Sequence, residues 1–241
     1  MKLKYSKFVI IALTFIGIIS CAKIKKPDAA VEREKWIASF TDSVEHYQQE
    51  SAIIDNQLSS LQNNMATQMA EFEFVKKPRE VSGYYILKGW INKLPLTSTG
   101  IYARINENEK LELIATLGGA TFNRLEVGGN YSEVVPHDQA FNFRHERYNT
   151  VYFSGGKADT IAEYISLYKN EKISLHFLEG NKNNKFQIPE NEKDMISKTW
   201  NLYNSQLKVK NLQKELWLCS RKIDTFRRMM DQQEQKENIN Q

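Results

Sequence analysis

The sequence of 241 residues predicts an α+β fold in which two long helices form an antiparallel coiled-coil stalk and a β-rich domain is inserted between them. Two observations predict the helices. Residues 31–76 and 190–233 contain neither Pro nor Gly, and in both segments apolar residues recur with the heptad spacing of a coiled-coil seam. A third observation predicts the insert, because residues 78–189 hold every glycine except Gly17 and alternate apolar with polar residues.

The N-terminal segment is organised as an export signal. A basic start, Met1–Lys7, precedes an apolar run from Phe8 to Ile19. This run is too short for a membrane-spanning helix, which needs about 20 residues. The basic start, the short apolar run and the small residue Ser20 together indicate a signal peptide over residues 1–20.

The end of this signal, Ile18-Ile19-Ser20-Cys21, resembles the lipobox of bacterial lipoprotein precursors. The resemblance implies that Cys21 becomes the first residue and is acylated, so that several acyl chains anchor the protein to a membrane. It also implies a location in the cell envelope, and the absence of Asp after Cys21 favours the outer membrane, facing the periplasm. Residues 21–30 are then a tether. The competing interpretation is an ordinary signal peptide followed by a coincidental cysteine.

The charge of the chain gives no support for nucleic-acid binding. From Cys21 onward there are 30 Lys and Arg against 29 Asp and Glu, because three of the 33 basic residues lie in the signal. Phosphate binding requires a concentrated basic surface, which this balance does not indicate. Cys219 is the only other cysteine, so acylation of Cys21 excludes an intramolecular disulfide.

The first long helix is predicted over residues 31–77. Asp28 is a suitable N-cap, and Lys76-Lys77 followed by Pro78 supplies a basic last turn and a stop. The seam residues are spaced by three and four, or by seven across a polar position. They are Ile37, Phe40, Val44, Tyr47, Ile54, Leu58, Leu61, Met65 and Phe72.

The second long helix is predicted over residues 190–233, with a phase slip between Leu207 and Val209. Residues 234–241 are predicted to be a disordered tail because only Ile239 among them is apolar. The matched lengths favour pairing of the two helices, although each could instead fold back separately onto the insert. The seam residues are Ile196, Trp200, Tyr203 and Leu207 before the slip, and Val209, Leu212, Leu216, Cys219, Ile223, Phe226 and Met230 after it.

The insert, residues 78–189, is predicted to contain about eight strands and one helix, Ala158–Tyr168. Glycine pairs separate the runs, and Gly89 is predicted to form a bulge inside the first strand. The predicted strands are Tyr84–Ile91, Ile101–Ile105, Lys110–Leu117, Thr121–Val127, Tyr131–Val135, Tyr148–Phe153, Lys172–Leu178 and Lys185–Ile188.

Patterns for catalysis or metal binding are weak. The motifs GxSxG, HExxH and CxxC are absent, and Ser154-Gly155-Gly156-Lys157 lacks the spacing of a phosphate-binding loop. Cys219 lies at a seam position, which predicts a small buried hydrophobic residue. We therefore expect no cofactor, since zinc needs three or four converging ligands. The weak metal candidates share one loop and are His137, Asp138, His145 and Glu146.

Two places have the composition of a contact with a partner protein. The loop over residues 137–147 combines aromatic residues with arginines, unless it is tucked onto the core. On the second helix, four consecutive apolar residues extend farther around the helix than one seam can cover. These features predict a protein partner or self-association through the stalk. The candidate contact residues are Phe141, Phe143, Arg144, Arg147, Trp217 and Leu218.

Together these features predict a non-enzymatic envelope lipoprotein, whose stalk carries a binding or docking domain in the manner of a scaffold or chaperone. The arrangement is similar to that of prefoldin-type chaperones, whose terminal helices pair below a β insert. It also resembles that of periplasmic efflux adaptors, which place the hairpin inside the β portion instead. No motif links the chain to either family. The alternative is an envelope hydrolase or metal-dependent enzyme that works from the 137–147 loop, which requires a concave pocket containing His137 or His145.

Overall fold

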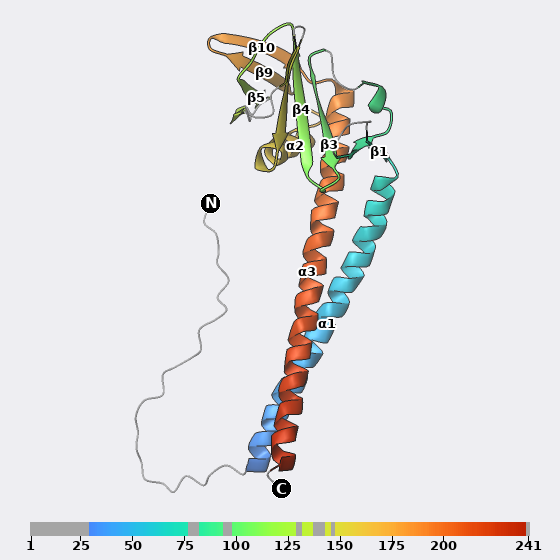
Figure 1. Ribbon diagram of the computed structural model, residues 1–241, viewed down its shortest axis with the longest axis vertical. Coiled ribbons are helices and arrows are strands. Elements are labelled where there is room, and N and C mark those ends of the chain that lie inside the picture. Colours follow the sequence, from blue (N-terminus) through green and yellow to red (C-terminus); the bar gives the residue numbers. More distant parts are fainter. Residues whose placement is uncertain are drawn as a thin grey trace, which may run out of the picture.

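The computed structural model describes residues 29–76, 82–93, 98–128, 132–136, 143–145 and 148–239. Within these ranges the chain is α+β, and the two long helices stand below two antiparallel sheets (Figure 1). The helices are α1 (Ala29–Met69), the 3-10 turn η1 (Ile91–Lys93), α2 (Gly156–Leu167) and α3 (Glu190–Ile239). The strands are β1 (Phe72–Val75), β2 (Tyr84–Leu87), β3 (Gly100–Asn106), β4 (Leu111–Gly118), β5 (Arg124–Gly128), β6 (Ser132–Pro136), β7 (Phe143–His145), β8 (Tyr148–Ser154), β9 (Ser174–Glu179) and β10 (Lys182–Gln187).

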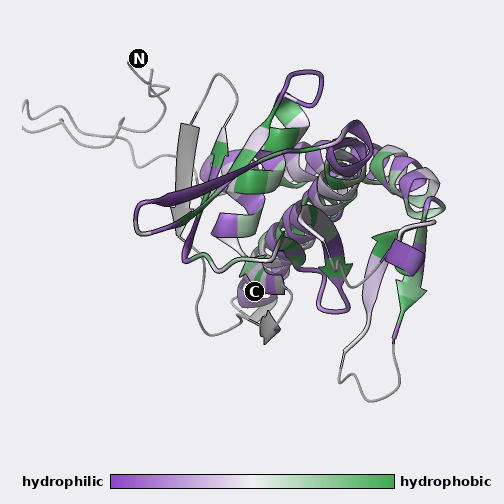
Figure 2. Cartoon of the chain, turned by 90° about the horizontal axis from the view of Figure 1, so that it is seen from above, coloured by the Kyte–Doolittle hydropathy of each residue, from purple (hydrophilic) through white to green (hydrophobic). Residues whose placement is uncertain are grey.

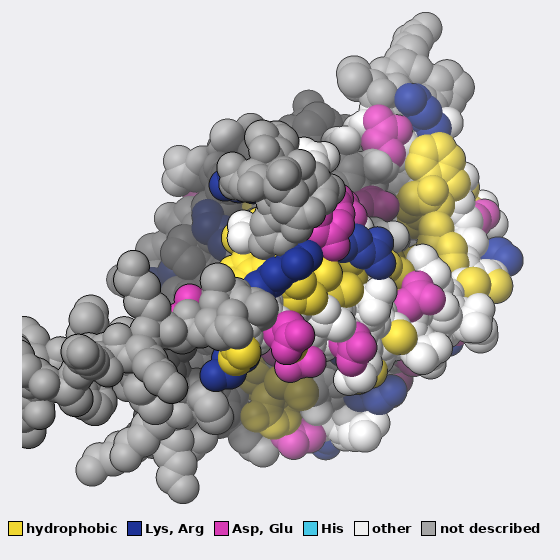
Figure 3. All heavy atoms as spheres, turned by 90° about the horizontal axis from the view of Figure 1, so that it is seen from below, with side chains coloured by type: hydrophobic (Ala, Val, Ile, Leu, Met, Phe, Trp, Pro, Cys, Tyr) yellow, Lys and Arg dark blue, Asp and Glu magenta, His cyan; other side chains and the backbone are white. Residues whose placement is uncertain are grey.

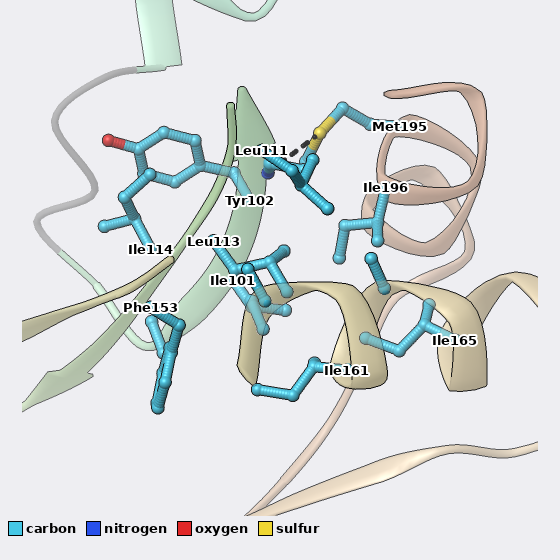
Figure 4. Close-up of a cluster of buried hydrophobic side chains, with 14 of the residues drawn as sticks. Ile101, Tyr102, Leu111, Leu113, Ile114, Phe153, Ile161, Ile165, Met195 and Ile196 are labelled. Carbon is cyan, nitrogen blue, oxygen red and sulfur yellow. Dashed lines mark hydrogen bonds between the residues drawn. The ribbon is translucent and has the colours of Figure 1, made fainter. Parts of the chain in front are cut away.

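The larger sheet has six strands in the order β1-β2-β3-β4-β8-β7, and one of its faces carries two helices. Side chains alternate across a strand, so Ile101 and Ile105 of β3 share this face with Leu113 of β4. Ile161 of α2 and Ile196 of α3 point at them from the helices, while the side chain of Tyr102 lies on the opposite face (Figure 4). The apolar face of the sheet and the two helices therefore bury one another.

The smaller sheet has four strands in the order β10-β9-β5-β6. Leu125 of β5 and Phe177 of β9 are fully buried and belong to the same core as the six-stranded sheet. The rings of Phe122 and Phe177 pack edge to face, with 4.8 Å between their centroids. At the edge, β10 is hydrophilic and mostly exposed (Figure 2), which is a common protection of an edge strand against pairing with another chain.

The first turns of α3 cover the part of the β3 edge that β2 leaves unpaired. Strand β2 pairs with β3 only opposite Ile105 and Asn106, so the earlier N–H groups of β3 need other acceptors. The N–H of Ile101 donates to the carboxylate of Glu192 at 3.0 Å, and the N–H of Ala103 donates to the sulfur of Met195 at 3.3 Å (Figure 4). This part of α3 is consequently an integral part of the sheet domain.

The rest of α3 runs antiparallel to α1, and the start of α1 lies beside the end of α3 at the free end of a helical hairpin (Figure 1). Near the sheets, the ammonium of Lys198 lies 2.8 Å from the carboxylate of Glu71. Farther down, the ring of Tyr47 stacks on that of Phe226 with 5.9 Å between centroids. From the sheets toward the free end, residue numbers therefore decrease along α1 and increase along α3.

Two predicted helix boundaries are wrong. Helix α1 ends at Met69 rather than near residue 77, and Phe72–Val75 forms the edge strand β1, because these residues pair with β2 and bury Phe72 and Val75. The predicted disordered tail, residues 234–241, is helical as far as Ile239, because good helix formers follow one another there without Pro or Gly. The last residues of the predicted first helix therefore belong to the six-stranded sheet.

All eight predicted strands of the insert are present among the described residues and in the predicted order, and the structure adds β1 and β7. The predicted strand Tyr84–Ile91 ends at Leu87, and Gly89 lies in the following turn with a φ of 81° rather than in a bulge. Phe143, Arg144 and His145, which the sequence analysis assigned to a loop, pair with β8 as β7. Their backbone completes one edge of the six-stranded sheet.

Candidate functional site

The contact between α1 and α3, here called the seam, contains most of the residues that the heptads predict. Ile54 and Leu58 of α1 are buried, as are Val209 and Cys219 of α3. The other seam residues from residue 37 to 65 and from 209 to 230 are buried or half-buried. Before the phase slip, Ile196 and Tyr203 pack instead into the core of the sheet domain, and the predicted seam residue Leu207 is exposed.

Aromatic side chains fill the seam near the free end. The ring of Phe226 lies between Phe40 and Tyr47, with centroid distances of 5.5 and 5.9 Å. The ammonium of Lys222 lies 4.3 Å from the centroid of the Tyr47 ring, and Trp36 packs on Phe40. These contacts hold the free end of the hairpin together.

Several large apolar side chains on the hairpin are exposed. The exposed fractions are 58% for Ile53, 59% for Trp217, 41% for Leu218 and 42% for Met229. The view from the free end shows hydrophobic side chains at the surface between Lys or Arg and Asp or Glu side chains (Figure 3). Isolated exposed apolar residues are common, but several on one helical hairpin indicate a contact surface.

The exposed residues lie on two flanks of the hairpin. Ile53 and Leu218 each precede a buried seam residue by one position, Ile54 and Cys219, whereas Trp217 follows the seam residue Leu216. Each residue of an α-helix is rotated by 100° about the helix axis from the residue before it. In an antiparallel pair of helices, the residues that directly precede seam positions therefore lie on the same flank of the pair, and those that directly follow lie on the other. Ile53 and Leu218 therefore share one flank, here called the Ile53 flank, and Trp217 lies on the other, the Trp217 flank. Met229 directly precedes the seam residue Met230 and so lies on the Ile53 flank as well.

The Ile53 flank is hollowed at two places along α1. The larger hollow, about 580 Å³, is lined by Ser39, Ser43, His46 and, from α3, Phe226, among others. The smaller hollow, about 430 Å³, is lined by Asn56, Gln57, Ser60, Leu61 and Asn64. Uncharged polar side chains dominate the smaller hollow, whereas the larger one also contains the charged Lys35 and Asp42 and the ring of Tyr47. Ile53 lies between the two hollows along α1.

The two helices of the hairpin carry opposite charge. The residues of α1 include six Asp and Glu against two Lys and Arg, and residues 207–236 of α3 include eight Lys and Arg against four Asp and Glu. On α3, Lys214, Arg221 and Arg228 recur every seven residues and so form one stripe. The guanidinium of Arg221 lies 5.6 Å from the centroid of the Trp217 ring.

A polar cluster on the sheet is the main alternative site. The guanidinium of Arg104 donates to the Glu112 carboxylate at 2.6 Å and lies 4.3 Å from the ring of Tyr84, and Asn106 donates to the second carboxylate oxygen of Glu112 at 2.9 Å. Burial raises the pKa of the neighbouring Tyr102 hydroxyl. The carboxylate and the guanidinium satisfy each other, so this cluster is best explained as a structural ion pair.

The candidate residues of the 137–147 loop are mostly outside the described residues. His137, Asp138, Phe141, Glu146 and Arg147 lie there, as does Cys21, while Phe143, Arg144 and His145 are placed as the backbone of β7. Within the described ranges, no three His, Cys, Asp or Glu side chains converge as metal ligands. His46 is exposed on α1, and His176 shares a hydrogen bond with Asn183 of β10.

Sequence reasoning missed two buried charges in the first turn of α3. The carboxylate of Glu192 is 8% exposed, and burial raises its pKa to about 7 although the Ile101 N–H and nearby Lys93 act in the opposite direction. Lys193 is 1% exposed and donates to the carbonyl oxygen of Glu171 at 2.6 Å. Both are structural, since each completes the attachment of α3 to the sheet domain.

Comparison with protein-family models, curated proteins and solved structures gives no match. Across the described part of the chain, no helix has the combination of length and hydropathy that crossing a bilayer requires. Among the described residues, the hairpin surface combines exposed apolar side chains, hollows and opposite charges, and it is the candidate functional site.

Proposed function

We propose that the chain is a membrane-anchored envelope lipoprotein that acts without catalysis, as a stalk and docking module of the scaffold or chaperone type. The observation that carries the proposal is the hairpin, whose free end holds the start of α1 while the sheet domain lies at the other end (Figure 1). Helix α1 begins eight residues after Cys21, so an acyl anchor there would attach the free end to the membrane.

In this proposal the hairpin is an antiparallel coiled coil that sets the distance between domain and membrane. Helix α1 has 41 residues, which corresponds to about 60 Å at 1.5 Å per residue. The buried heptad positions on both helices support the coiled coil. The membrane is then the outer membrane, and the domain extends into the periplasm. The proposal includes neither a cofactor nor nucleic acid.

The Trp217 flank supports a docking role. Trp217 is the most exposed aromatic residue of the described hairpin, and the basic stripe of Lys214, Arg221 and Arg228 runs beside it. Tryptophan and arginine are the residue types that most often dominate the binding energy of protein interfaces. We therefore propose an envelope protein with an acidic, partly apolar surface as the partner of this flank.

Replacement of the two cysteines tests the anchor. In wild-type protein extracted from envelopes, mass spectrometry is expected to show residues 1–20 removed and a lipid mass on Cys21. A Cys21→Ser variant is expected to lose its membrane attachment, and Cys219→Ser is the matched control that keeps it. A Cys21→Ser chain that is cleaved yet remains on the membrane would refute the proposal.

A further inference from the structure

The Ile53 flank presents projections and hollows at matching heights on its two helices. Contacts between α1 and α3 fix these heights, since Tyr47 lies beside Phe226 and Glu71 beside Lys198. By this register Ile53 is level with Leu218 on the opposite helix, and Met229 is level with the larger hollow of α1. At these two heights, each helix thus offers a contact for the other helix of a facing hairpin.

We propose that this flank is the interface between two copies of the chain, related by a two-fold axis parallel to the hairpin. The axis brings α1 of one copy against α3 of the other and makes a four-helix bundle in which all neighbouring helices are antiparallel. Leu218 of each copy packs on Ile53 of the other. Met229 of each copy enters the hollow lined by Ser39, Ser43 and His46.

A second copy is the occupant that the described features favour. The larger hollow is lined mainly by α1, whereas Met229 projects from α3, so an arrangement that places α3 of one copy against α1 of the other brings Met229 to the hollow. The same arrangement places the acidic helix α1 against the basic helix α3. A two-fold axis along the hairpin also keeps both free ends on one side, as two chains anchored in one membrane require.

This interface leaves the Trp217 flank uncovered. Trp217 and the basic stripe lie on the other side of the seam, so dimerisation and docking of the proposed envelope partner use different surfaces. The dimer deepens the proposed role of the hairpin, because it stiffens the stalk and presents two sheet domains. It does not depend on lipid, however, and can be tested on a chain that lacks the anchor.

Disulfide cross-linking of the full chain tests the dimer. In a non-lipidated Cys21→Ser, Cys219→Ser background, the pair Ile53→Cys and Leu218→Cys is expected to give covalent dimers on mild oxidation. The matched control is Ala52→Cys with Trp217→Cys, two level positions on the other flank, and it is expected to give at least tenfold fewer dimers. Each single-cysteine variant is expected to remain monomeric.

Several outcomes would overturn the dimer. They are equal dimer yields from both pairs, dimers from Ile53→Cys alone, or a disulfide confined to one chain. Sedimentation provides a second measurement that does not need oxidation: Leu218→Glu is expected to convert a micromolar dimer to a monomer, and Trp217→Glu to leave it dimeric. A wild-type chain that sediments as a monomer refutes the proposal, while the lipidation of Cys21 stands or fails on its own experiment.

Discussion

Glu192 and Lys193 are consecutive charged residues that are buried where α3 enters the sheet domain. Glu192 accepts the Ile101 N–H of an unpaired strand edge, and Lys193 reaches the Glu171 carbonyl and the carboxylate of Glu190 at 2.7 Å. No sequence pattern marks these two residues, since charged side chains at the start of a helix are ordinarily exposed. Their burial results from long-range packing of α3 against β3, which local periodicity does not describe.

The raised pKa of Glu192 predicts a pH-dependent stability. The carboxyl has a pKa of about 7 in the folded chain, above its ordinary value of 4.5, so the folded state holds the proton more tightly than the unfolded state. This contribution is complete below pH 4.5, declines between pH 4.5 and 7, and is lost above. Glu192→Gln keeps an acceptor for Ile101 and is expected to remove that decline, which is about 3 kcal/mol.

Thermal unfolding between pH 5 and 8 measures this effect. Relative to wild type, Glu192→Gln is expected to gain stability as the pH rises, by about 5 °C in the unfolding midpoint. The exposed residue Glu45 supplies the control, since Glu45→Gln is expected to follow wild type at every pH. A Glu192→Gln profile parallel to that of wild type would contradict the assignment.

Lys193→Met tests the second buried charge. Methionine retains most of the apolar stem but removes the ammonium that donates to the Glu171 carbonyl, and the expected loss is about 1–3 kcal/mol in the free energy of unfolding. Lys214→Met, at an exposed position of the same helix, is expected to change this free energy by less than about 0.5 kcal/mol. Equal effects from both variants, measured by urea titration, would show that the buried hydrogen bond is unimportant.

At the scale of elements, the phase slip in α3 separates two packing partners. Before it, Ile196 and Tyr203 face the core of the sheet domain, and after it, Val209 and Cys219 face α1. Heptad spacing therefore predicted both long helices and the residues of their seam. It did not predict the end of α1, because Phe72 fits the helical spacing while Phe72-Glu73-Phe74 also fits the alternation of a strand, and pairing with β2 decides between them.

Insertions in α1 test whether the heptad phase holds the hairpin together. One alanine inserted between Asn56 and Gln57 turns the part of α1 toward the free end by 100°, which removes Tyr47 and Ile54 from the seam. Insertion of seven residues at the same point keeps the phase. Limited trypsin digestion is expected to cleave α3 near Arg227 much faster in the one-residue variant than in the seven-residue variant. Equal protection of the two variants would contradict a coiled-coil seam.

The Trp217 flank makes a prediction about the partner. Trp217→Ala is expected to abolish cross-links between the chain and its envelope partner, because it removes the aromatic anchor of the proposed docking surface. Leu167→Ala is the matched control, since Leu167 is also an exposed apolar residue, at 72%, but lies on α2 of the sheet domain. Cross-linking in intact envelopes measures both variants. If only Leu167→Ala loses the cross-links, the docking surface lies on the sheet domain and not on the Trp217 flank.

At the scale of the whole molecule, the long helical hairpin carries the sheet domain at one of its ends. The α+β class and the order of helix, strands and helix could be predicted from the sequence, because heptads and glycine-rich alternation differ plainly along the chain. The division into two sheets could not, since it depends on β5 pairing with β9 across 45 intervening residues, from Gly128 to Ser174 at the closest pair. The Ile53 flank likewise emerges only when α1 and α3 are placed in register.

Fluorescence resonance energy transfer from the protein to labelled lipids tests whether the free end of the hairpin lies at the membrane and the sheet domain lies far from it. The lipidated chain, in a Cys219→Ser background, is reconstituted in vesicles with acceptor-labelled headgroups and carries a donor at Gln233→Cys or at Lys185→Cys. Gln233 lies near the free end of α3 and Lys185 lies in β10, with a hairpin of about 60 Å between domain and free end. Strong transfer from residue 233 and little from residue 185 is the expected result. Equal transfer from the two positions, or stronger transfer from residue 185, would contradict the stalk.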